Sequence, residues 1–150
     1  MIKSFRGRLS DGGQAKIRLS TKKGKIGYKV VSLEIIQQSP GAAGSDNEGL
    51  VQVFKVKQSS IPNTIDFSDG NLLAMGFYSG NPSADQYPND MIVVFDNEVF
   101  NQDIFICYSD IRGVGDKMNY MLKLESFTMT DNATAVSTLR DIRLNPQVPA

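Results

Sequence analysis

Hydrophobic and polar residues alternate along much of the chain, in short runs that are separated by turn-forming residues. A period of two sends successive side chains to opposite faces of a β-strand, so each run predicts a strand. Residues 50–57 alternate most cleanly. Similar runs occupy residues 2–9, 15–19, 26–37, 65–67, 72–79, 91–95, 99–100, 103–108 and 118–129. The pattern therefore predicts an all-β chain.

Three of these runs carry apolar residues on both faces. Residues 103–108 are apolar throughout, which is typical of a central strand. Residues 26–37 place Tyr28 and Val30 on one face and continue with apolar residues, from Val31 onward, on the other. In residues 118–129 the apolar positions change parity after Leu124, which predicts a β-bulge near residues 125–126.

Clusters of Gly, Ser, Asn, Asp and Pro mark the connections. Residues 39–49 and 80–90 are predicted as long loops, which either bind a partner or are tolerated insertions. Residues 21–25 are predicted as an exposed turn, and residues 112–117 as a hairpin turn rather than a phosphate-binding loop. After Asp131 the pattern fits either a short C-terminal helix or a last strand with an extended tail.

About eight strands in two layers account for this pattern. The chain of 150 residues has no composition change that marks a boundary, so we expect a single domain over residues 1–150. The fold class predicted is an all-β sandwich, jelly-roll-like, with a short C-terminal helix or an extended tail.

The formal charge is zero, but the two signs are separated along the chain. Residues 1–29 hold nine basic residues and one acid, whereas the remainder holds seven basic residues and fifteen acids. If these segments lie on different surfaces, the protein suits contact with copies of itself or with a polyanion. The alternative is that the strands mix the signs and leave an even surface.

The residue types that are missing from the sequence argue against several classes of catalytic and metal site. The sequence contains no histidine, which removes the commonest general base and most zinc sites, and we expect a protein that is not an enzyme and has no cofactor. The single Cys107 lies in an apolar run, so we expect a buried and unreactive thiol. No apolar run reaches the roughly 20 residues of a membrane helix, and the first six residues lack the apolar segment of a signal peptide.

Several segments resemble a group of small proteins that marine bacteriophages encode. They are Met1–Gly7, Gly12–Gln14 with Lys16–Leu19, Asp66–Asp69 with Leu72–Ala74, Val94–Ile104, Met118–Tyr120 and Leu139–Arg143. The likeness covers most of the chain but contains no mechanistic motif. It implies a virion structural protein, a β-sandwich associated with the capsid, and it assigns no catalytic residue.

The candidate site residues are basic and lie close together in the sequence. We expect Lys16, Arg18, Lys22, Lys23 and Lys25 to contact an acidic surface of another subunit. Contact with DNA phosphates is the rival interpretation, but the aromatic residues of a single-strand-binding groove are missing from this segment.

An acidic stretch of the chain offers several carboxylate oxygens, which are the ligands that calcium prefers. Its members are Asp90, Asp96, Glu98 and Asp103. Their spacing is not that of an EF-hand, so no metal site is predicted.

The function expected is that of a non-enzymatic virion protein, either a decoration protein or a minor capsid component. Its expected partners are copies of itself and the major capsid or other virion proteins, with no membrane and no small-molecule substrate. We expect it to be made in the host cytoplasm and located in the virion. The alternative is a receptor- or glycan-binding module of a tail fibre or spike, against which the lack of tryptophan counts.

Overall fold

The computed structural model describes residues 1–39, 47–80, 89–111 and 116–130. This part of the chain contains eight strands and no helix. The strands are β1 (Ile2–Leu9), β2 (Gln14–Ile17), β3 (Ile26–Gln37), β4 (Asn47–Phe54), β5 (Leu72–Gly80), β6 (Asn89–Val94), β7 (Ile104–Asp110) and β8 (Met118–Thr128). The prediction of an all-β chain is confirmed.

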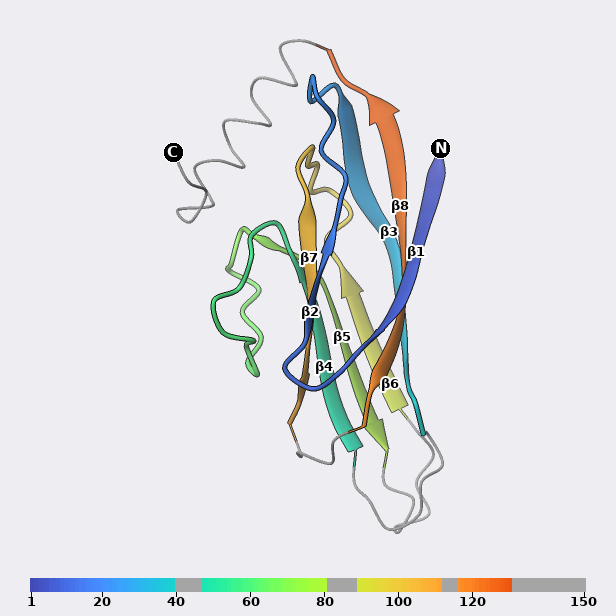
Figure 1. Ribbon diagram of the computed structural model, residues 1–150, viewed down its shortest axis with the longest axis vertical. Helices are drawn as coiled ribbons and strands as arrows, with labels where there is room; N and C mark the ends of the chain where they lie inside the picture. Colours follow the sequence, from blue (N-terminus) through green and yellow to red (C-terminus); the bar gives the residue numbers. More distant parts are fainter. Residues whose placement is uncertain (40–46, 81–88, 112–115, 131–150) are drawn as a thin grey trace.

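The strands form two antiparallel sheets that face each other as a sandwich (Figure 1). The first sheet has three strands in the order β1-β8-β3. The second has five strands in the order β2-β7-β4-β5-β6. All pairs of neighbouring strands are antiparallel. The two facing sheets confirm the predicted β-sandwich.

The strand pairs are nested in the manner of a jelly roll. β1 pairs with β8, β2 with β7 and β4 with β5. These are three of the four antiparallel pairs that define a jelly roll of eight strands. The remaining nested pair would join β3 to β6. Here β6 lies beside β3 but forms its hydrogen bonds with β5.

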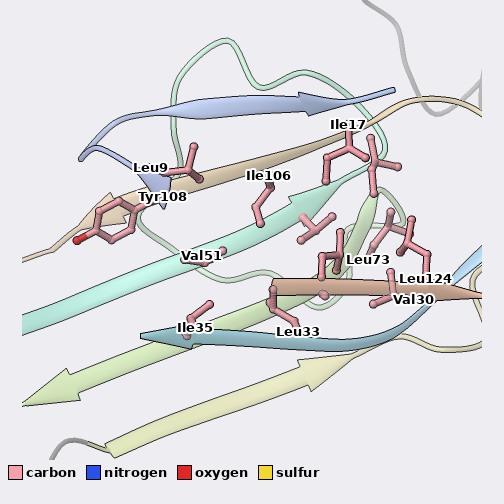
Figure 2. Close-up of a cluster of buried hydrophobic side chains, with 14 of the residues drawn as sticks. Leu9, Ile17, Val30, Leu33, Ile35, Val51, Leu73, Ile106, Tyr108 and Leu124 are labelled. Atoms are coloured by element: carbon pink, nitrogen blue, oxygen red, sulfur yellow. The ribbon is translucent and has the colours of Figure 1, made fainter. Parts of the chain in front are cut away.

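The core lies between the two sheets, where side chains from both layers point toward one another (Figure 2). Val30, Leu33 and Leu124 come from the three-stranded sheet, and Val51 and Ile106 come from the five-stranded sheet. All five are at most 2% exposed. Burying such a side chain stabilises a fold by about 1.5–3 kcal/mol, so this alternation of buried positions fixes the register of the strands.

A bulge lies in β3 rather than in β8, and this corrects the prediction for residues 125–126. The register of β3 against β8 shifts between Val30 and Ser32, so Val31 is the extra residue and is 44% exposed. The bulge brings Leu33 onto the same inner face as Val30. The change of parity in residues 26–37 therefore marks a bulge and not a strand with two apolar faces.

Two short predicted strands are not formed. Residues 65 and 66 are irregular and residue 67 begins a turn, in which the Asp66 carboxylate accepts hydrogen bonds from the backbone N–H of Ser68 at 2.9 Å and from its hydroxyl. Residues 99–100 form no strand, and Phe100 makes an isolated bridge with Tyr28.

The two long predicted loops are shorter than expected, since residues 47–49 belong to β4, residue 80 to β5 and residues 89–90 to β6. The predicted hairpin turn at 112–117 and the C-terminal helix or tail fall largely or wholly outside the described residues.

The outer faces of the two sheets differ. On the five-stranded sheet, Phe54, Leu72 and Cys107 form a second buried cluster, which Ile61 and Phe95 cover from the adjoining connections. No described segment covers the outer face of the three-stranded sheet (Figure 1). No helix in the described ranges is long and apolar enough to span a membrane.

Candidate interaction surface

The five basic residues predicted as a contact site lie in one exposed segment, residues 16–25, which we call the basic segment. Along its extended first half, Ile17 and Leu19 point into the core and are each 5% exposed. Lys16 and Arg18 alternate with them and are exposed. The predicted exposed turn is confirmed, since Lys22, Lys23 and Lys25 are exposed as well.

Asp103, just before β7, holds the middle of the basic segment. Its Oδ1 accepts hydrogen bonds from the backbone N–H of Leu19 at 2.7 Å and of Ser20 at 2.8 Å. Its Oδ2 lies 3.4 Å from the Lys16 ammonium. Burial raises the pKa of Asp103, but these hydrogen bonds outweigh it and the pKa is lowered overall. The sequence suggested Asp103 only as a cation ligand, and its anchoring role depends on a contact across 84 residues.

The turn at residues 21–25 is fixed by backbone hydrogen bonds. Gly24 has a φ of 63°, a left-handed conformation that favours glycine, and its N–H donates to the Thr21 carbonyl at 3.1 Å. The buried Asn101 side chain donates to the Gly24 carbonyl at 3.0 Å, and the Met129 N–H donates to the Lys25 carbonyl at 2.7 Å. The basic side chains therefore project from a backbone that hydrogen bonds fix in place.

The fold partly cancels the separation of charge along the sequence. Lys29 lies 3.5 Å from Glu125 across the β3–β8 pair, and Lys16 lies beside Asp103. The Lys3 ammonium lies 5.7 Å from the centre of the Tyr28 ring. By contrast, Arg18, Lys22 and Lys23 form no ion pair within the described residues. These three are the part of the basic segment that is open to a partner.

A groove with a volume of about 660 Å³ crosses the outer face of the three-stranded sheet. Six side chains that alternate outward form its walls, two from each strand. They are Arg6 and Arg8 on β1, Asn119 and Met121 on β8, and Glu34 and Ile36 on β3. The other lining residues, Gly7, Ile35 and Tyr120, alternate toward the core, so their backbone forms the floor.

The register of the sheet places the groove residues in two rows. Arg6 and Glu34 are both paired with Met121, from opposite sides, and Arg8 and Ile36 are both paired with Asn119. Arg6, Arg8 and Glu34 are exposed and form no ion pair with another described residue. Sequence reasoning missed this groove, because the three strands come together only through pairings of residues more than 80 positions apart.

The shifted pKa values in the described residues have structural causes. Burial raises the pKa of the Cys107 thiol to about 12, and it raises the pKa of Tyr108 and Tyr120 as well. Cys107 is 1% exposed, so the expected buried thiol is confirmed. Hydrogen bonds from Ser68 lower the pKa of Asp66. None of these shifts brings a group near neutral pH, where an acid or base catalyst works best.

Two of the four carboxylates in the candidate calcium site have other contacts. Asp103 holds the basic segment, and Glu98 lies 3.1 Å from the Lys55 ammonium. Among the described residues, no three side chains of His, Cys, Asp or Glu are grouped so as to hold a metal ion.

Comparisons with known proteins add no family to this description. The sequence matches no protein-family model and no curated protein.

Proposed function

We propose that this chain is a non-enzymatic structural protein of a phage particle, a decoration protein or minor capsid component. The observation that carries the proposal is the nested pairing of β1 with β8, β2 with β7 and β4 with β5. Jelly rolls with eight strands are a common architecture of viral capsid domains. This support is at the level of the fold, and the resemblance of sequence segments to proteins of marine phages agrees with it.

The basic segment supplies the contact in this proposal. Arg18, Lys22 and Lys23 would face an acidic surface of the shell or of another copy, and apolar contacts would hold the assembly once it has formed. Charge pairing of this kind steers association and fixes register more than it adds affinity. The anchoring of residues 19 and 20 by Asp103 limits the conformational entropy that is lost when the partner binds.

The experiment is an incorporation assay with a charge-reversed variant. Lys22→Glu with Lys23→Glu should slow or abolish incorporation into particles of the phage that encodes the chain. The variant should fold normally, because exposed charges contribute little to stability. Lys57→Glu is the matched control, since Lys57 is exposed in the connection between β4 and β5. Incorporation of the double variant at the wild-type level would remove the basic segment from the proposal. Absence of the wild-type chain from purified particles would overturn the proposal itself.

A further inference from the structure

The groove on the outer face of the three-stranded sheet has charges of opposite sign on its two sides. Arg6 and Arg8 lie on β1, at one edge, and Glu34 lies on β3, at the other. Met121, on the central strand β8, lies between Arg6 and Glu34 in the same row. Neighbouring strands are about 4.8 Å apart, so roughly 10 Å separates the backbones of Arg6 and Glu34.

The apolar part of this face is exposed as well. Ile36 is 51% exposed and lines the groove next to Asn119. The five-stranded sheet covers its own outer face with residues of its connections, whereas none of the described residues covers this one. Ile36 and the half-buried Met121 form a short apolar strip that is rimmed by charges, a pattern typical of a protein–protein contact.

We propose that a second copy of this chain binds this face through the same face of its own, with the two-fold axis running along β8. This inference rests on the proposed function, because it names the surface through which copies meet. In a two-fold interface the same residues meet from both sides. A rotation about an axis along β8 exchanges the β1 and β3 edges. Arg6 of one copy then meets Glu34 of the other, twice, whereas Met121 and Lys123, which lie on the axis strand, meet their own counterparts. The two Arg6–Glu34 contacts outnumber the single like-charge contact between the two Lys123 side chains.

The alternative two-fold arrangement is disfavoured by the same charges. An axis that runs across the strands keeps β1 opposite β1, so Arg6 and Arg8 of one copy would face the arginines of the other. Like charges at an interface are strongly unfavourable. In the favoured arrangement, Arg8 lies opposite Ile36, where the aliphatic part of the arginine packs on the isoleucine. Packing with strands nearly aligned is also a common geometry for two sheets.

The size of the face sets the affinity that we expect. It is three strands wide, which is smaller than the standard interface of about 800 Å² on each partner. We therefore expect a weak dimer, with a Kd on the order of micromolar to tens of micromolar, that forms readily where copies are concentrated, as on a particle.

The test uses two single charge reversals and their mixture, measured by sedimentation over a range of concentrations. Arg6→Glu places two glutamates opposite each other at each contact, and Glu34→Arg places two arginines there. Each variant alone should dimerise at least about 100-fold more weakly than the wild type. When the two variants are mixed, glutamate meets arginine at both contacts, so a mixed dimer should form with near wild-type affinity.

Matched controls and the contrary outcomes complete the design. Lys57→Glu and Asp96→Arg make the same changes of charge at exposed positions away from the face, and both should dimerise as the wild type does. A wild-type chain that stays monomeric to about 1 mM would overturn the inference. So would reversed variants that dimerise normally, or a mixture that stays monomeric. Wild-type binding of a glycan that both reversals abolish, without dimerisation, would assign the groove to a sugar instead.

The failure of this inference is distinguishable from failure of the proposed function. A chain that is incorporated into particles but never dimerises through this face contradicts only the inference. A chain that dimerises as described but is absent from purified particles contradicts the proposed function. The assignment of this face as the dimer contact would then still hold.

Discussion

The ammonium group of Lys55 is almost completely buried and lies 3.1 Å from the Glu98 carboxylate. The side chain of Lys55 is 2% exposed, whereas that of Glu98 is 39% exposed. Lys55 directly follows β4, and Glu98 lies in the turn that follows β6. The pair therefore ties together two connections that are 43 residues apart.

Removing the negative charge should cost more than removing the positive one. Glu98→Gln leaves a buried ammonium beside a neutral amide and should lower the free energy of unfolding by about 1.5–3 kcal/mol. Lys55→Met removes the buried charge and should cost less. Urea unfolding measures both, with the exposed Lys57→Met as control. A Glu98→Gln variant as stable as the wild type would show that other contacts hold Lys55.

The contact of Asp103 with the basic segment predicts a local effect on hydrogen exchange. Asp103→Ala removes the acceptor for the N–H groups of Leu19 and Ser20, so amide exchange at these two residues should accelerate. The lowered pKa of Asp103 also means that its ionised carboxyl stabilises the native state. This contribution to stability should be complete above about pH 4 and should disappear as the pH falls through the native pKa of Asp103. Asp96→Ala is the exposed control. Unchanged exchange at residues 19 and 20 would contradict the anchoring role.

Burial of Cys107 predicts a loss of stability in alkaline solution. Its native pKa is raised to about 12 from 9.0, so the unfolded chain loses the thiol proton first. The contribution of Cys107 to stability should therefore be constant below about pH 9 and decline between about pH 9 and 12. Cys107→Ala should make this decline shallower, and the raised pKa of Tyr108 accounts for part of what remains.

Because Cys107 is buried, a thiol reagent should label the native protein slowly and the urea-unfolded protein at once. Rapid native labelling would contradict the burial.

Gly49 lies where the core has no room for another carbon atom. A Cβ there would collide with the terminal methyl of Met118 and lie 3.0 Å from the Tyr108 ring. Gly49→Ala should therefore lower the free energy of unfolding by about 1–3 kcal/mol, through overpacking. Combining it with Met118→Leu should recover part of the loss, because the two changes are coupled. Strict additivity in thermal or urea unfolding would show that the collision is relieved elsewhere.

The strand pattern was predictable from the sequence because burial alternates with a period of two. The run at residues 26–37 coincides with β3, and the apolar run at 103–108 predicted the central position of β7 between β2 and β4. The turn at residues 21–25 followed from its composition. The strand predicted at residues 65–67 failed because the contact of Asp66 with Ser68 favours a turn over an extended chain.

The bulge at Val31 marks a limit of prediction from the alternation of apolar and polar residues. The change of parity was visible in the sequence, but only the pairing with β8 reveals that both halves of β3 face the core. The same limit applies to the candidate surfaces. The basic residues were found from composition, whereas Asp103, Asn101 and the groove depend on contacts between distant segments.

The proposal that this chain is a structural protein of a phage particle is tested most directly by locating the chain in such a particle. A reconstruction of purified particles at side-chain resolution should show the sandwich bound to the shell. Lys22 and Lys23 should lie next to acidic residues of a neighbouring subunit. A particle in which other chains account for every part of the shell, its decorations and its minor components, with this sandwich nowhere in the density, would contradict the account.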